Sequence, residues 1–214
     1  MRLAALLLVL PLAAAAQQSA PVVRVEYSNP GGTPTHWTLV LRANGQGNFR
    51  AEPAKPAPGL KTIEVPTIDR GVQISPDFAG RVFRVATSDR VLGNKCESHL
   101  RVAFQGWKTI QYQGPEGKGS CTFNYSRDRQ IQEMGESLVA VAATLIEGAR
   151  LELLRQHDPL GLDRETSFMV EGAADGRLQQ IGAIRNILES LEQDPAVMEM
   201  VRKRIRILLA RAER

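Results

Sequence analysis

The spacing of apolar residues changes once along this 214-residue chain, close to Arg127. Before that point, short segments alternate apolar and polar residues, and a period of two indicates β-strands with one buried face. After it, apolar residues recur every three or four positions, which indicates amphipathic helices. This segregation predicts an α+β fold with one antiparallel sheet from the N-terminal half, packed by C-terminal helices, and disfavours an alternating α/β fold.

The strand-rich half, residues 17–126, also contains one short helix. Ser75 is a favoured N-cap residue, and Pro76 suits the first helical position, so we expect the helix to begin there. The hairpin prediction rests on Asn44-Gly45, because these residues tolerate the positive φ of a tight turn. The predicted strands are VVRVEY (22–27), the hairpin over 36–52, TIEV (62–65), GVQI (71–74), LRVAF (100–104), KTIQY (108–112) and SCTFNY (120–125).

The helical half, residues 127–214, opens with an apolar stripe that predicts one long helix ending at Asp158-Pro159, since the residue before proline avoids helical angles. We expect a loop and a short helix starting near Asp163, a third helix, and a last helix from Pro195 to about residue 212. The stripe consists of Ile131, Met134, Leu138, Val141, Leu145 and Ala149, and the third helix is marked by Leu178, Ile181, Leu188 and Leu191.

The N-terminus reads as a secretory signal peptide, residues 1–16, followed by a single domain, residues 17–214. Arg2 is followed by a short apolar run and small residues up to Ala16, which are the three parts of such a leader. The run is shorter than the roughly 20 residues that cross a bilayer. We therefore expect an exported protein, periplasmic or extracellular, with no transmembrane segment after cleavage.

Both cysteines, Cys96 and Cys121, lie in the mature part. An even number of cysteines in an exported chain favours a disulfide. The alternative is a metal site that includes His99, but its spacing from Cys96 fits no closed zinc pattern. We predict one disulfide and no metal.

The segment QGPEGKG, residues 113–119, is rich in glycine and raises the possibility of a phosphate-binding loop. Such a loop needs Ser or Thr after Gly-Lys, with a strand before it and a helix after it. Here Gly119 follows Lys118, and strand-like segments flank both sides. We interpret these residues as turn residues, and no cofactor is predicted.

Catalytic signatures are sparse. The three histidines, His36, His99 and His157, belong to different predicted elements, and no Gly-x-Ser-x-Gly motif is present. The glutamates of the long helix lie outside its apolar stripe among arginines, which indicates a solvated charged face rather than a carboxylate site. These charged residues are Glu133, Glu136, Glu147 and Glu152, with Arg127, Arg129, Arg150 and Arg155.

The last predicted helix is amphipathic and basic. Arg202, Lys203, Arg206 and Arg214 lie opposite its apolar side, where they could contact an anionic surface. The alternative is a terminal helix that packs on the domain, with its arginines near the negative end of the helix dipole. The absence of aromatic anchors favours this alternative.

These observations favour an exported, non-enzymatic binding or scaffold protein with a protein or envelope partner. The net charge of +4, or +3 after loss of Arg2, does not indicate a nucleic-acid partner. Loops 53–59 and 113–119 are candidate recognition segments. Two alternatives remain open: an exported hydrolase that uses His99 or His157 with a carboxylate, and attachment to the envelope surface through residues 195–214. The oligomeric state is not predicted.

Overall fold

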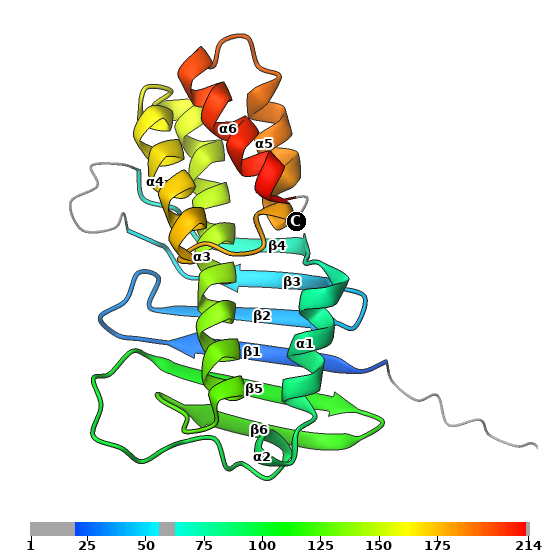
Figure 1. Cartoon of the computed structure of the whole chain (residues 1–214). Helices are drawn as coiled ribbons and strands as arrows, with labels where there is room; N and C mark the ends of the chain where they lie inside the picture. Colours follow the sequence, from blue (N-terminus) through cyan, green and yellow to red (C-terminus); the bar gives the residue numbers. More distant parts are fainter. Residues whose placement is uncertain (1–19, 56–62, 213–214) are drawn as a thin grey trace, which may run out of the picture.

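The computed structural model describes residues 20–55 and 63–212. Six strands form one antiparallel sheet in the order β4-β3-β2-β1-β5-β6 (Figure 1). They are β1 (Val22–Ser28), β2 (His36–Arg42), β3 (Gln46–Ala51), β4 (Ile68–Gln73), β5 (Trp107–Gly114) and β6 (Gly117–Phe123). The helices are α1 (Pro76–Ala86), α2 (Asp89–Leu92), α3 (Arg129–His157), α4 (Gly161–Asp175), the 3₁₀ turn η1 (Ile181–Ile184), α5 (Arg185–Glu192) and α6 (Glu199–Ala212).

The molecule has two layers beside a helical bundle. Helices α1 and α3 lie on one face of the sheet, while α4, α5 and α6 pack around the part of α3 that continues past β4 (Figure 1). Alternation along each strand sends apolar side chains to the helical face, where Val25, Leu39 and Ile110 are buried. The opposite face presents polar side chains such as Arg24, Thr38, Asn48, Arg50 and Thr122, which are exposed or half-buried. The predicted α+β fold is confirmed.

Local signals position most of these elements. Gly45 has φ +82° in the predicted turn between β2 and β3. The Ser75 side chain accepts a hydrogen bond from the Phe78 amide and so caps α1. Asp128 accepts hydrogen bonds from the amides of Gln130 and Ile131 at the start of α3. The long helix and its buried stripe are confirmed, since all six predicted stripe residues are buried.

Residues 100–104, predicted as a strand, form no strand. The positive φ angles of His99 (+56°) and Gly106 (+99°) interrupt any extended path into β5. The Val102 amide instead donates to the Leu100 carbonyl, and the Asn124 side chain donates to the Ala103 carbonyl and accepts from the amide of the next residue but one, Gln105. Alternation of apolar residues was therefore a misleading signal here, because these side chains point into solvent.

Several boundaries also differ from the prediction. TIEV contributes only an isolated bridge between Val65 and Ala54, and Thr62 lies outside the described residues. The last helix begins at Glu199, because the Asp194 side chain accepts a bond from the Ala196 amide and forms a turn. The third helix is split into η1 and α5, α4 begins at Gly161 and spans 15 residues, and α2 was not predicted.

Arg150, predicted on a solvated face of α3, is buried, with its side chain only 2% exposed. It forms ion pairs with Glu147 (2.7 Å) and Glu165 of α4 (3.8 Å). Its guanidinium also donates to the carbonyl oxygens of Ile63 and Lys55. The prediction failed because α4 and the chain before β4 cover this side of the helix, which the helix sequence alone does not reveal.

Candidate functional site

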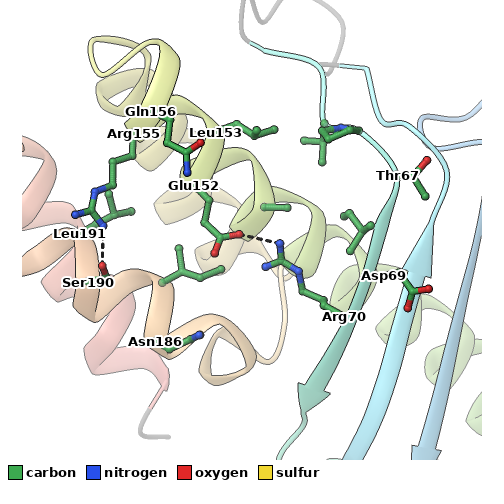
Figure 2. Close-up of a pocket in the computed structure, with 15 residues that line it drawn as sticks. Thr67, Asp69, Arg70, Glu152, Leu153, Arg155, Gln156, Asn186, Ser190 and Leu191 are labelled. Carbon is green, nitrogen blue, oxygen red and sulfur yellow. Dashed lines mark hydrogen bonds and ion pairs between the residues drawn. The ribbon is translucent and has the colours of Figure 1, made fainter.

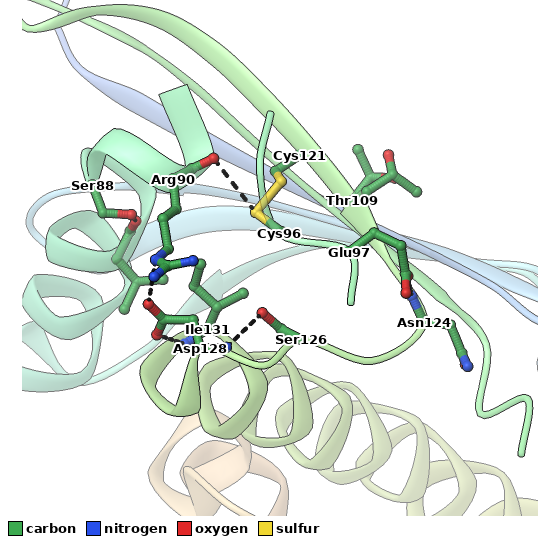
Figure 3. The surroundings of a disulfide bond; sticks show 12 residues. Ser88, Arg90, Cys96, Glu97, Thr109, Cys121, Asn124, Ser126, Asp128 and Ile131 are labelled. Atoms are coloured by element: carbon green, nitrogen blue, oxygen red, sulfur yellow. Dashed lines mark hydrogen bonds and ion pairs between the residues drawn. A yellow bond between two sulfur atoms is a disulfide. The ribbon is translucent and has the colours of Figure 1, made fainter. Parts of the chain in front are cut away.

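The segment that connects α2 to β5, residues 94–106, is anchored at several points, and we call it the stapled loop. Its covalent anchor is the predicted disulfide, which is confirmed: Cys96 bonds Cys121 of β6, with the Cα atoms 5.8 Å apart (Figure 3). Both cysteines are buried. The two sulfur atoms bond each other, so the alternative metal site with His99 is excluded.

A carboxylate holds the next turn of the stapled loop. Glu97 accepts hydrogen bonds from the Asn124 amide (2.7 Å), the His99 amide (3.0 Å) and the Ser98 hydroxyl (3.2 Å). Burial raises the pKa of Glu97, but these hydrogen bonds together outweigh burial, so the pKa lies below its usual value. Glu97 therefore stays ionised and ties the loop to the end of β6.

The far end of the stapled loop is held by Asn124 and Tyr27. The Asn124 side chain accepts from the Gln105 amide (2.7 Å) and donates to the Ala103 carbonyl (3.2 Å). Tyr27 donates to the Gln105 carbonyl (2.9 Å) and lies against Gly106, where a Cβ would come within 2.5 Å of its ring. Gly106 is thus required both by its positive φ and by this close approach.

Three large apolar side chains project into solvent from the stapled loop, and a fourth projects beside them from Trp107, the first residue of β5. Eight such side chains are exposed in the described part of the chain, and four of them fall within residues 100–107. The rings of Phe104 and Trp107 meet edge to face, 5.8 Å apart. We call the four residues the apolar quartet: Leu100, Val102, Phe104 and Trp107. A concentration of this kind on a fixed loop is typical of an interaction site.

Lys108 lies beneath the loop on the helical face of β5 and is buried. Its ammonium donates to the Gly106 carbonyl (3.2 Å) and lies 5.5 Å from the Phe123 ring centroid. Burial lowers the pKa of Lys108, and the charges of Glu136 and Glu97 oppose this effect only in part. The lysine supports the start of β5 from inside and does not belong to the exposed surface.

The three histidines lie in separate parts of the fold. His99 is exposed on the stapled loop near the start of α3, whereas His157 is the last residue of that 29-residue helix, roughly 43 Å long. His36 begins β2, on the polar face of the sheet. Across residues 20–55 and 63–212, no group of three or more His, Cys, Asp or Glu side chains could hold a metal ion.

The basic residues of α6 lie mostly in ion pairs. Arg202 pairs with Glu199 (2.7 Å), and Arg206 pairs with Glu199 (2.6 Å) and Glu192 (3.4 Å). Lys203 is exposed, and Arg214 lies outside the described residues. The apolar side of the helix packs into the core through Val201, Ile205 and Leu208.

Of the two predicted recognition loops, residues 113–119 are described in full and are mostly exposed. Residues 113–119 form the tight hairpin between β5 and β6, in which only Pro115 and Glu116 lie between the strands, and Gly117 has φ +120°. The interpretation of this segment as a turn is confirmed. Of the loop 53–59, residues 56–59 lie outside the described residues.

The sequence analysis missed the apolar quartet as a site, because it assigned Leu100, Val102 and Phe104 to a strand and made no prediction for Trp107. The available signal was an apolar segment between a cysteine and a glycine, but the alternation of apolar and polar residues made it resemble a strand.

Comparison with known protein families and with characterised proteins found no family and no protein that this chain matches. Among the described residues, no helix is long and apolar enough to span a membrane.

Proposed function

We propose that this chain is an exported, non-enzymatic binding protein that recognises a partner protein through the apolar quartet. The observation that carries this proposal is the combination of exposure and fixation: Phe104 is 50% exposed on a loop held by a disulfide and by two side chains of the sheet half, Asn124 and Tyr27. A loop fixed before binding loses little conformational entropy on association. Aromatic anchors at a rigid surface are also the residues that dominate binding energy in protein interfaces.

Export is part of the proposal because it explains the disulfide. A buried disulfide forms and persists in an oxidising compartment. The apolar N-terminal run supports the same compartment through its likeness to a signal peptide. The alternative compartment, a reducing cytosol, would leave Cys96 and Cys121 as thiols and would remove the covalent link between the stapled loop and β6.

The experiment is a quantitative pull-down from an envelope extract with three forms of the mature chain. These are the wild type, the double variant Leu100→Ser, Phe104→Ser, and the control Leu160→Ser, which changes a side chain that is 77% exposed on another part of the surface. We expect one partner to be enriched by the wild type and the control and lost with the double variant. Equal recovery by all three forms, or no enrichment by any, would contradict the proposal.

A further inference from the structure

Strand β4 forms the other edge of the sheet: it pairs with β3 on one side, and no strand of the described residues pairs with its outer side. The Ile74 amide donates to the Gly45 carbonyl (2.9 Å), and β3 and β4 pair with Gln46 opposite Gln73. Main-chain groups alternate in direction along an antiparallel strand, so Ile68, Arg70 and Val72 also point their N–H and C=O groups at β3. Asp69, Gly71 and Gln73 point theirs outward, and within the described residues these outward groups form no hydrogen bond.

A groove runs along this edge, with a volume of about 950 Å³ beside residues 65–70 (Figure 2). Its opposite wall is α5, through Asn186, Ile187, Ser190 and Leu191. A second hollow continues beside Gly71–Gln73 and again includes Asn186. The groove is closed beyond Gln73, where the Ser75 amide donates to the Gln180 side chain (3.0 Å). We call these two hollows together the edge groove.

Helix α3 forms the floor of the edge groove because it is longer than the sheet is wide. Its 29 residues extend roughly 43 Å, whereas six strands span about 24 Å from the first to the last. The part of α3 that passes β4 contributes Ala149, Glu152 and Leu153 to the lining. A strand added beside β4 would therefore lie against α3, as the six existing strands do.

The charges in the groove largely pair with one another. Arg70 bonds Glu152 (2.8 Å), and Arg155 bonds Asp194 (2.8 Å) and the Ser190 hydroxyl (2.7 Å). The lining beside these pairs is mixed: Ala149 of α3 and Ile187 and Leu191 of α5 are apolar and buried, whereas Gln156 of α3 and Asn186 of α5 are polar but uncharged. A ligand with apolar side chains toward this lining fits it better than a charged one, since unpaired charges here would have to be desolvated.

We propose that the edge groove binds an extended, uncharged peptide segment of a partner protein, which adds to β4 as a seventh strand. The ligand is a peptide because the outward groups of β4 are the main-chain N–H and C=O of Asp69 and Gly71. These groups can form hydrogen bonds with the main chain of another strand. Alternate side chains of the segment face α3, where Ala149, Ile187 and Leu191 favour apolar residues, and the others face the open side of the sheet. This site does not depend on the apolar quartet.

Gly71→Pro is the decisive variant, with Gly71→Ala as its matched control. Proline removes the outward N–H of residue 71 and leaves the bonds of Arg70 and Val72 to β3 intact, as is tolerated on edge strands. Alanine keeps the N–H, and a Cβ at this position meets nothing closer than 3.9 Å. A second pair, Asn186→Trp and Asn186→Ala, fills or preserves the groove from the α5 side.

The probe is a phage-displayed library of random linear dodecapeptides, selected on the immobilised mature chain with the disulfide intact. We expect alternating apolar and uncharged polar sequences, whose affinity falls at least about tenfold for Gly71→Pro and Asn186→Trp and is unchanged for the two alanine variants. We also expect slower amide exchange at Asp69 and Gly71 when a selected peptide is bound. Thermal unfolding of each variant confirms that it is folded.

Three results would overturn the proposal. The first is a selection that yields no sequence above background, and the second is a set of peptides that bind wild type and both blocking variants equally. The third is a dimer, detected by sedimentation, that Gly71→Pro abolishes, in which case a second copy of the chain, and not a peptide, occupies β4. Failure of the pull-down described for the apolar quartet would leave this site intact, because the two sets of variants share no residue.

Discussion

The stapled loop and the edge groove lie at opposite ends of the same sheet, and they are held in place by different means. At the β6 end, a covalent link and one carboxylate fix a loop whose side chains project outward. At the β4 end, the buried guanidinium of Arg150 fixes the chain before β4 and leaves main-chain groups to face a groove. One surface therefore exposes side chains, and the other exposes main-chain groups. Each anchor can therefore be removed separately.

Removal of the ionic anchor should have the largest effect. Arg150→Met leaves the carboxylates of Glu147 and Glu165 without their buried cation, and breaking such an interaction costs about 3–5 kcal/mol. We expect this loss in the free energy of unfolding, measured by urea denaturation. The double variant Arg150→Met, Glu165→Gln should recover part of it, and a loss below about 1 kcal/mol for Arg150→Met would show that the cluster does not anchor this end.

Removal of the covalent anchor should lower the free energy of unfolding slightly less than Arg150→Met does. The disulfide closes a loop of 25 residues, which the chain-entropy relation values at about 3.5 kcal/mol. Cys96→Ala, Cys121→Ala should lower the free energy of unfolding by this amount. Amide exchange should also become faster in residues 97–105 but not in β4. Equal acceleration at both ends would contradict the separation of the two anchors.

The carboxylate anchor, Glu97, should contribute only about 1 kcal/mol to the free energy of unfolding, because it is partly exposed and water screens its hydrogen bonds. Glu97→Gln removes the charge that accepts from the amides of Asn124 and His99. The pKa of Glu97 is lowered in the folded state, so its contribution is complete above the pKa of the unfolded chain and is lost as the pH falls through the folded pKa.

Denaturation between pH 2 and pH 7 checks this effect. The difference in stability between wild type and Glu97→Gln should be largest near neutral pH and should shrink in acid. A difference that grows as the pH falls would have the wrong sign and would exclude Glu97 as an ionised anchor.

The smallest effect on stability should come from the apolar quartet itself. Leu100→Ser, Phe104→Ser changes exposed side chains, and such substitutions usually alter the free energy of unfolding by no more than about 0.5 kcal/mol each. The control is Ile110→Ser in β5. Because this side chain is buried, its replacement should lower the free energy of unfolding several times more. A large loss for the exposed pair would mean that these residues serve the fold and not a partner.

The basic face of α6 allows one further comparison with the quartet. Arg202 and Arg206 pair with glutamates, so we expect Arg202→Gln, Lys203→Gln, Arg206→Gln to leave co-sedimentation with anionic liposomes unchanged and near background. Strong binding by the wild type that this triple variant abolishes would instead support attachment through the last helix.

The fold could be predicted from the sequence where one local signal and the tertiary environment agreed. The stripe on α3 required only the helical period, and the turn at Gly45 required only a residue that tolerates positive φ. The prediction failed where distant segments decide burial. Arg150 is covered by α4 and the chain before β4, and Phe104 is exposed because the loop bonds to Asn124 rather than to a strand.

The two candidate sites also differ in how far they could be recognised from the sequence. The apolar quartet was visible as a sequence segment, although its exposure was not. The edge groove had no sequence signal, because it arises from the strand order and from the length by which α3 exceeds the width of the sheet. Free backbone groups on β4 become evident only when the strand is known to lie at an edge.

The most direct test of the central claim is site-specific photo-crosslinking in the producing cell. A photoreactive phenylalanine analogue at position 104 should give one discrete covalent adduct with a partner protein, while the same analogue at position 160 should give none. The adduct at position 104 should also disappear when Cys96 and Cys121 are replaced by alanine. The same adduct from both positions, or none from position 104, would contradict recognition through the stapled loop.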